Sequence, residues 1–521
     1  MFSTVLSATI DGLKVEFVQV EVDASNGLPL FHMVGYLSAE VREAAERVKT
    51  AIQNIGIWIP PKKMIINLAP ATVKKKGAAF DLPIAAAILI SFGYICQKAL
   101  EDVLIIGELG LDGEVLRVPG VLPIMIEAKN QGYRTCLIPR GNEMEGSYVE
   151  EMQVIGVENI QDVIEYAQSP AKFRENQEER KKQFKQDQNS KLHTKTSSEN
   201  EELDFRDIQG QEIVKRAAEV AVAGQHNLLM IGTPGASKTM IAKRIPTILP
   251  PLSRVESMEI SKIYSIMGLL GENQPLISKR PFRQVHHTAT KAALVGGGVI
   301  PSPGEISLAN GGVLMMDELA EFPKAVLEVL RQPLEEHKIQ ITRTMGTYCF
   351  PADFLLVAAM NPCPCGYYPD YNRCTCTQSA IDAYLGRISQ PFLSRLDICI
   401  EAPRVDYDDL KRGKRGDSSD EIRGRVCRTR EIQNLRYLGK DFSTNGRLPA
   451  SEIEKYCPLD ETCEKMMKLA YDKLNLTART YHKILRVART IADLNGEEQI
   501  QSMHLAEALS YRTIDKKYWG K

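Results

Sequence analysis

The chain has 521 residues, 44% of them hydrophobic and 25% charged, which is the balance of an ordinary soluble globular protein with three or four domains of roughly 100–200 residues each. The formal net charge of −1 gives no overall attraction for nucleic acid, so any such contact must come from local basic patches. The sequence contains no run of about 18 apolar residues, so we expect no contact with a membrane.

The first 167 residues alternate short apolar runs with helical stretches. Residues 63–68 and 103–106 are apolar runs with the length of buried strands. Residues 38–55 place Val41, Ala44 and Val48 at helical spacing, which predicts an amphipathic helix. We therefore expect residues 1–167 to form an α/β domain of their own.

The composition changes between residues 168 and 203. Glu, Lys, Gln, Asn and Ser dominate there, which predicts a charged linker. From residue 204 to about 405 strand and helix patterns alternate again, which indicates a parallel sheet. Residues 406–521 have helical periodicity and little strand pattern, so we expect a helical domain at this end.

A glycine-rich turn follows the apolar run 228–231. Its residues Gly232, Gly235, Ser237, Lys238 and Thr239 come close to the P-loop pattern G-x-x-x-x-G-K-[ST], whose backbone N–H groups bind phosphates at a helix N-terminus. Lys238 would contact the β- and γ-phosphates of ATP, and the Thr239 hydroxyl would hold Mg²⁺. Ser237 replaces the last glycine of the pattern, which is unfavourable if that position needs a positive φ. The alternative is a turn that binds no nucleotide.

Two later strand patterns end in polar side chains. The apolar run 313–316 leads to Asp317, which would bind Mg²⁺ through water, and to Glu318, which would orient or deprotonate the attacking water. The run 354–360 leads to Asn361, which could hold that water between Glu318 and the γ-phosphate. Each run also has a structural alternative. Asp317 and Glu318 would then simply mark the end of a strand, and Asn361 would start a turn before proline.

Two arginines are candidates for catalysis. Arg395 would reach the nucleotide of a neighbouring subunit, where such an arginine contributes roughly 10³–10⁵ in rate. Its alternative is a surface ion pair with Asp397. Arg479, in the helical end of the chain, would fold over the γ-phosphate. Its alternative is an exposed helix arginine without a partner in catalysis.

Four of the eleven cysteines lie close together in the sequence. Cys363, Cys365, Cys374 and Cys376 could close a tetrahedral structural zinc site at the carboxyl end of the predicted sheet. The C-x-C spacing is tighter than the usual C-x-x-C, so free or disulfide-forming cysteines are the alternative. The other seven are scattered, which favours a reducing compartment and predicts a cytoplasmic protein.

Taken together, these motifs resemble an AAA+ ATPase. The run 280–290, the glycines at 296–298 and the run 303–309 resemble the magnesium-chelatase-like branch, and specifically the ComM/YifB family, as do residues 25–29, 67–71, 80–85 and 478–482. The resemblance covers nearly the whole chain apart from the linker. It implies an α/β fold in which an AAA+ P-loop core (204–405) is followed by a helical lid, similar to the carboxyl-terminal domain of magnesium chelatase (406–521).

The family resemblance also implies a function. We expect a homo-oligomer, a hexameric ring, that hydrolyses ATP with Mg²⁺ and binds single-stranded or branched DNA. Family members are associated with branch migration when imported DNA recombines during natural transformation, so a DNA helicase is the expected activity. The competing expectation is a nucleotide-driven chaperone or chelatase-type motor that remodels a protein partner.

The amino-terminal domain resembles the proteolytic domain of Lon, in the α+β fold shared with domain 2 of ribosomal protein S5. Residues 107–116 carry this comparison. Lon-type hydrolysis uses a serine and a lysine, and these positions fall at about Asp81 and Leu122 here. Because neither residue is the nucleophile or the base of such a dyad, we expect no protease activity and predict a structural or docking role.

Residues 338–350 alternate around a Met-Gly turn, which predicts a β-hairpin just before the Asn361 strand. In the AAA+ branch that the chain resembles, such a hairpin points into the central pore. Lys338 and Arg343 are therefore candidates for phosphate contacts, which position DNA without determining sequence specificity. Strand charges that simply face solvent are the alternative.

Overall fold

The structure is a computed structural model that describes residues 1–177, 203–271, 275–298, 301–344, 346–404 and 416–520. The chain divides into two compact units, Met1–Glu199 with Ser257–Ile277, and Asn200–Glu256 with Ser278–Lys521. The predicted linker, residues 168–203, lies mostly outside the described residues. Within the described ranges every helix is too short or too polar to cross a bilayer.

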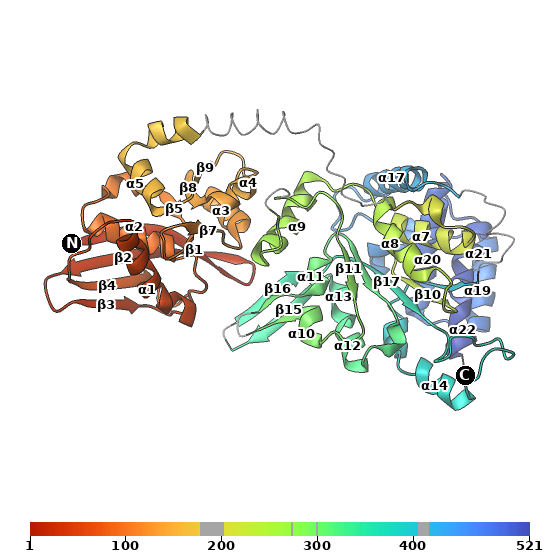
Figure 1. Cartoon of the computed structure of the whole chain (residues 1–521). Coiled ribbons are helices and arrows are strands. Elements are labelled where there is room, and N and C mark those ends of the chain that lie inside the picture. The colour runs from red at the N-terminus through yellow and green to blue at the C-terminus, as the bar shows by residue number, and fades with distance from the viewer. Residues whose placement is uncertain (178–202, 272–274, 299–300, 345, 405–415, 521) are drawn as a thin grey trace. The chain divides into compact units, whose positions relative to one another are not determined.

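The first unit is built on a seven-stranded mixed sheet (Figure 1). Its strands are β1 (Phe2–Asp11), β2 (Lys14–Ser25), β3 (Leu30–Val34), β4 (Lys63–Ala69), β5 (Val103–Ile105), β8 (Thr135–Pro139) and β9 (Gln153–Val157), in the order β3-β4-β2-β1-β5-β8-β9. The pairs β1–β2 and β2–β4 are antiparallel, and all the other pairs of this sheet are parallel. The predicted strands at 63–68 and 103–106 are β4 and β5.

Helices cover both faces of this sheet. They are α1 (Ala39–Asn54), α2 (Asp81–Ser91), α3 (Val121–Asn130), α4 (Glu143–Gly146) and α5 (Ile160–Gln168). Because side chains alternate along a strand, Val103 and Ile105 of β5 join the core formed with α1, α2 and α5, whereas Leu104 joins the core formed with α3. The helix predicted at 38–55 is confirmed as α1, and Val41, Ala44 and Val48 are fully buried.

A segment from the middle of the sequence belongs to the first unit. Helix α9 (Arg254–Ile266) and the residues after it fall within the range predicted as AAA+ core, yet Ser257–Ile277 groups with the amino-terminal domain. Here Arg117 donates to the carbonyl of Leu270 at 2.6 Å, and the amide of Leu122 lies 3.3 Å from the hydroxyl of Ser265. Such contacts between residues far apart in sequence are not visible in local patterns.

The second unit is built on a five-stranded sheet in which every pair of strands is parallel. The strands are β10 (Leu228–Gly232), β11 (Phe282–Val285), β14 (Val313–Met316), β17 (Leu355–Met360) and β18 (Ile398–Ala402), in the order β11-β14-β17-β10-β18. The carboxyl ends of parallel strands meet at one edge of the sheet, where ligands bind in open α/β folds. Strand β10 lies between β17 and β18, so the turn after β10 adjoins the residues that follow β17.

Shorter elements surround this sheet. Helices α7 (Glu212–Gly224) and α8 (Lys238–Ile248) flank β10 in sequence, and α10 (Lys291–Val295), α11 (Glu305–Leu308), α12 (Lys324–Val329), α13 (Arg331–Glu336), α14 (Gln378–Leu385) and α15 (Gln390–Leu393) fill the connections. The predicted hairpin is confirmed as β15 (Lys338–Arg343) paired antiparallel with β16 (Gly346–Pro351). A second small hairpin joins β12 (Gly296–Gly297) to β13 (Ser302–Pro303).

The carboxyl-terminal part is helical, as predicted. Its main helices are α17 (Ser419–Arg436), α19 (Glu461–Leu474), α20 (Ala478–Leu494), α21 (Ser502–Ser510) and α22 (Thr513–Trp519), drawn in blue in Figure 1. Two ion pairs fix α20: Asp493 binds Arg436 of α17 at 2.6 Å, and Lys483 binds Asp397 at 2.8 Å. All four side chains are buried or half-buried, so these pairs hold α20 both to α17 and to the residues just before β18.

Candidate active site

The turn after β10 has the geometry of a phosphate-binding loop. Strand β10 ends at Gly232 and α8 begins at Lys238. Gly235 has φ +80° and Ser237 has φ +56°, so both adopt the left-handed conformation. The position of Ser237 therefore does need a positive φ, and a serine here carries the strain that a glycine would avoid.

Lys238 points back over this loop. Its Nζ donates to the carbonyl oxygens of Gly232 at 2.7 Å and Thr233 at 3.0 Å, and to Oδ1 of Asn361 at 3.2 Å. Burial lowers the pKa of Lys238 from its ordinary value, and the nearby carboxylate of Asp317 partly opposes this. An ammonium that is partly stripped of water in this way interacts strongly with an incoming phosphate.

Thr239 and Asp317 bring two oxygen ligands together. The hydroxyl of Thr239 donates to Oδ2 of Asp317 at 2.6 Å, and Oδ1 of Asp317 accepts from the amide of Glu318 at 2.9 Å. Hydroxyl and carboxylate oxygens are ligands that Mg²⁺ prefers. This pair of side chains therefore fits a magnesium ion that accompanies a nucleotide.

Glu318 has a partner that the sequence did not reveal. Its Oε2 lies 3.0 Å from Nδ1 of His287, which follows β11. Glu318 itself has φ +53°, so its backbone is held in the left-handed region directly after β14. Nothing in the local sequence of His287 indicates this contact, because it joins the ends of two neighbouring parallel strands.

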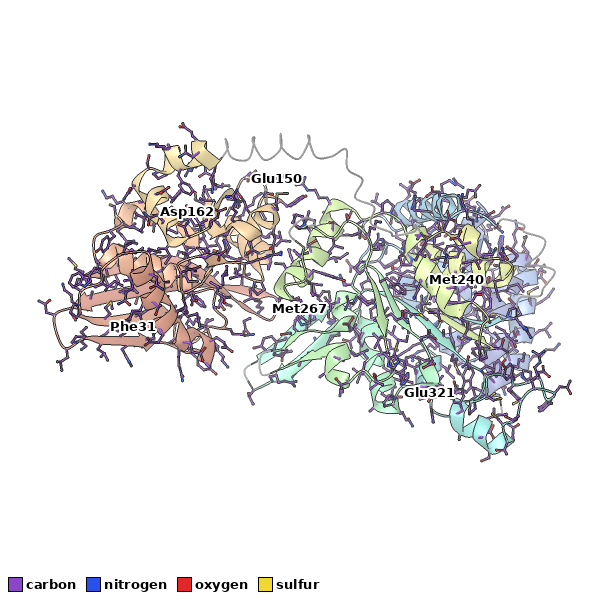
Figure 2. All side chains as sticks on the ribbon, in the orientation of Figure 1. Phe31, Glu150, Asp162, Met240, Met267 and Glu321 are labelled. Carbon is purple, nitrogen blue, oxygen red and sulfur yellow. The ribbon has the colours of Figure 1, made fainter. Side chains whose placement is uncertain are left out.

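One cavity collects the predicted nucleotide residues. It has a volume of about 320 Å³, and its walls are residues 234–240 together with Asp317, Glu318, Met360 and Asn361. Met240, labelled in Figure 2, lies on α8 and packs against the hydrophobic core of this unit. The P-loop, the acidic pair and the asparagine thus meet at the carboxyl ends of β10, β14 and β17.

The two predicted arginines lie in a different cavity, of about 1260 Å³. Arg395 binds Oε2 of Glu335 at 2.9 Å, and Arg479 binds Oε1 of the same carboxylate at 3.0 Å. Neither arginine lines the P-loop cavity. Asp397, the alternative partner of Arg395, pairs with Lys483 instead. Arg479 thus lines the cavity that contains Glu335, and its predicted position over a γ-phosphate stays a prediction.

The candidate DNA residues and the cysteines are placed as follows. Lys338 and Arg343 are exposed on β15, and Arg343 donates to the carbonyl of Thr342 at 3.2 Å. The four clustered cysteines follow β17 directly, and their sulfur atoms all lie within 4.8 Å of one another. All eleven cysteines of the chain are free.

The residues aligned with a Lon-type dyad are packed inside the first unit. Asp81 accepts from Nε of Arg47 at 2.7 Å and from its second guanidinium nitrogen at 2.9 Å. Leu122 is fully buried at the start of α3. An aspartate paired with arginine and a buried leucine are neither nucleophile nor base, so the absence of protease activity stays our prediction.

The chain is similar to known proteins over nearly its whole length. Residues 204–410 match the family described as "Magnesium chelatase, subunit ChlI", residues 20–142 match "Subunit ChlI of Mg-chelatase", and residues 416–512 match "Magnesium chelatase, subunit ChlI C-terminal". A shorter similarity, 29% identity over 176 residues, links the chain to the Lon protease of Campylobacter jejuni, covering 30% of this chain and 22% of that protein.

Two relatives match from end to end. The competence protein ComM of Haemophilus influenzae is 41% identical over 507 residues, covering 96% of each chain. The protein YifB of Salmonella typhimurium is 40% identical over 507 residues, covering 97% of this chain and 96% of its own. With its parallel sheet, P-loop and helical carboxyl-terminal domain, the chain therefore belongs to the ComM/YifB family of magnesium-chelatase-like AAA+ ATPases.

Proposed function

We propose that this protein is a ring-forming ATPase that moves DNA, a helicase for branch migration in recombination during natural transformation. The observation that carries the proposal is the single cavity in which Lys238, Thr239, Asp317, Glu318 and Asn361 converge. The relative from Haemophilus influenzae is named a competence protein, which supports a role with DNA taken up by the cell. Because none of its eleven cysteines forms a disulfide, we place the protein in the cytoplasm.

The residues of this cavity would divide the work of γ-phosphoryl transfer. Lys238 and the backbone N–H groups of the P-loop bind the β- and γ-phosphates, and Thr239 and Asp317 hold Mg²⁺, which neutralises phosphate charge when bound. Glu318 orients or deprotonates the attacking water, and Asn361 fixes the position of that water. Catalysis is then mostly positioning and charge stabilisation, which needs no covalent intermediate.

Arg395 and Arg479 would complete the site of a neighbouring subunit. Both side chains point into a cavity that none of the P-loop residues lines, and Lys483 and Arg486 line the same cavity. Carboxylates line this cavity too, and Glu335 binds both arginines, so a triphosphate from another chain would have to replace Glu335 as their partner. The arrangement requires a homo-oligomer, and we take it to be a hexameric ring in which each seam forms one active site.

The β15–β16 hairpin would contact DNA in the pore of this ring. Ile339 and Ile341 face the core, so Lys338, Gln340 and Thr342 are left exposed on the other face. Arg343 comes next, within 3.5 Å of the carbonyl of Gly298 in the neighbouring β12–β13 segment. Two cations beside exposed polar groups can bind phosphates without sequence preference.

The proposal is tested by ATP hydrolysis with and without forked DNA. We expect DNA to stimulate the parent protein, with strong salt dependence. Glu318→Gln should bind ATP but lose about 10²–10⁴-fold in rate, and the Lys338→Ala/Arg343→Ala variant should lose stimulation while keeping its basal rate. Lys465→Ala is the matched control, because Lys465 is an exposed lysine of the helical domain that pairs with Glu461. Hydrolysis that ignores DNA but responds to a protein partner would instead establish a chaperone or chelatase-type motor.

A further inference from the structure

The loop between β17 and α14 has no regular secondary structure, although it connects a buried strand to a helix with one buried face. It runs from Met360 to Gln378 and begins with Asn361 of the active site. Long loops of this kind in compact domains are uncommon unless they are functional. Something other than a helix or a sheet ladder must therefore keep this loop in one conformation.

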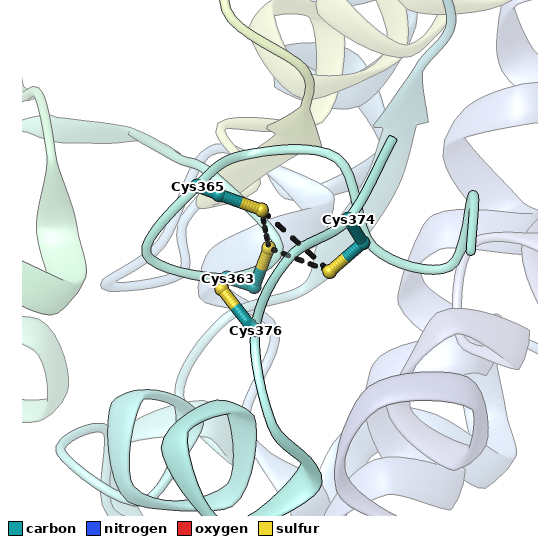
Figure 3. Close-up of side chains that lie close together, drawn as sticks. All are labelled: Cys363, Cys365, Cys374 and Cys376. Carbon is teal, nitrogen blue, oxygen red and sulfur yellow. Dashed lines mark hydrogen bonds between the residues drawn. The ribbon is translucent and has the colours of Figure 1, made fainter. Parts of the chain in front are cut away.

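The four cysteines of this loop converge on one point (Figure 3). Cys363 Sγ lies 3.4 Å from Cys365 Sγ and 3.8 Å from Cys374 Sγ, and Cys365 Sγ lies 3.6 Å from Cys374 Sγ. A tetrahedral ion with zinc–sulfur bonds of about 2.3 Å separates its sulfurs by about 3.8 Å. Disulfide sulfurs are only about 2.05 Å apart. The spacing is thus that of four thiolates around a single ion.

The surroundings of the sulfurs favour thiolates and exclude larger cofactors. Cys363 is fully buried, the other three are half-buried, and the amide of Tyr368 donates to Cys363 Sγ at 3.4 Å. Backbone donors of this kind stabilise the charge of a ligating sulfur. Sulfurs this close together leave no room for an iron–sulfur cluster, which four cysteines also bind.

The same loop touches the P-loop. Gly366 lies directly after the first two cysteines and has φ +86°. A Cβ built on Gly366 would lie 2.5 Å from Cδ and 2.8 Å from Cγ of Pro234, so only glycine fits there. The cysteine loop therefore packs against the wall of the nucleotide cavity at Pro234 and supplies Asn361 to it.

The loop also reaches the carboxyl-terminal helix. The ring of Tyr368 packs edge-on against Tyr518 of α22, with 6.1 Å between the ring centroids, and Tyr518 donates to Glu401 of β18 at 3.0 Å. One short segment thus carries Asn361 and contacts both the P-loop and the helical domain.

We infer that Cys363, Cys365, Cys374 and Cys376 bind one structural Zn²⁺ ion, which braces the P-loop and Asn361 against the carboxyl-terminal helix. The metal site follows from the cysteine geometry alone, and its bracing role rests on the ATPase function proposed above. With four protein ligands the ion has no open position, so its contribution is to folding and not to chemistry.

The metal content of the purified full-length protein tests the site. We expect one zinc ion per chain in the parent protein. The zinc content should fall to background in the double variant Cys365→Ser/Cys374→Ser. It should be unchanged in Cys96→Ser, which alters an exposed cysteine of the first unit. If the double variant fails to fold, the parent protein is treated with a thiol-modifying reagent, and the zinc that is released is measured. In addition, parent protein loaded with Co²⁺ should show the strong visible absorption of a tetrahedral thiolate site. Background zinc in the folded parent, or iron with sulfide, would overturn the site.

Nucleotide binding tests the bracing role separately. Parent protein stripped of zinc should bind a fluorescent ATP analogue several-fold more weakly and recover when zinc is restored; unchanged binding would overturn the brace. Lys238→Ala should keep its zinc and lose nucleotide binding. If Lys238→Ala binds nucleotide like the parent, the ATPase proposal fails while the zinc content still decides the metal site.

Discussion

The imidazole of His287 lies 3.0 Å from the carboxylate of Glu318. The two side chains come from the ends of β11 and β14, which are neighbouring strands of the sheet. Glu318 also lines a second cavity, of about 420 Å³, that His286 and His287 share with it. His287 therefore approaches the proposed catalytic carboxylate from the neighbouring strand β11.

We predict that His287→Ala raises ATP hydrolysis in the absence of DNA. Without its partner, Glu318 is free to turn toward the attacking water, and a half-exposed pair of this kind accounts for at most about a fivefold change. The measurement is the basal ATPase rate. Lys465→Ala is the control, because it removes an exposed ion pair with Glu461 in the helical domain. Equal rates for the two variants would contradict a restraint on Glu318.

Arg395→Ala should lower ATP hydrolysis by about 10³–10⁵-fold in a pure preparation. Because we propose that this arginine acts on the neighbouring chain, mixing Arg395→Ala with the equally inactive Lys238→Ala should restore part of the activity. Some seams of a mixed ring then join an intact Lys238 to an intact Arg395. The readout is the ATPase rate after subunit exchange. No recovery at any mixing ratio would show that the arginine does not act across a seam.

Ser237→Gly should stabilise the second unit by about 1 kcal/mol. Ser237 has φ +56°, and a non-glycine residue in the left-handed region costs roughly 1–2 kcal/mol. The gain should appear as a higher midpoint of urea unfolding. Replacing Gly235, at φ +80°, by alanine is the reciprocal change and should destabilise the protein. A Ser237→Gly midpoint at or below that of the parent would count against strain at this position.

Lys483→Met should destabilise the helical domain by about 3–5 kcal/mol, because it leaves Asp397 buried without its cation. Among the described residues, the remaining hydrogen-bond donor to this carboxylate is then the amide of Asn227, at 2.8 Å. The double variant Lys483→Met/Asp397→Asn should recover much of this loss, since no unpaired charge then remains. Free energies of unfolding for both single variants and the double variant give the coupling energy. If the two substitutions changed the free energy of unfolding in a strictly additive way, a stabilising interaction between Lys483 and Asp397 would be contradicted.

Lys338→Ala and Arg343→Ala should each weaken DNA binding without changing sequence preference. If each cation neutralises one phosphate, the slope of the logarithm of affinity against the logarithm of salt concentration falls by about one per variant. Titrations at several salt concentrations measure this slope, with Lys465→Ala as the control. A slope unaffected by either change would place the DNA elsewhere on the protein.

Local sequence patterns were sufficient to predict several helices and strands and the P-loop. The helix at α1, the strands β4, β5, β10, β14 and β17, and the hairpin were all predictable, because hydrophobic periodicity and turn residues act over a few positions. The polar residues after three parallel strands were predictable as a group for the same reason, since parallel strands end at one edge of the sheet.

The sequence by itself therefore determined that the P-loop, the acidic pair and Asn361 would lie together, and which family the chain belongs to. Only the tertiary structure decided that Arg395 and Arg479 share Glu335, that His287 reaches Glu318, that Gly366 packs on Pro234, and that Ser257–Ile277 joins the first unit. These contacts join segments that are distant in the chain or lie on different elements. Their energy depends on how whole elements pack, and no short stretch of sequence records that.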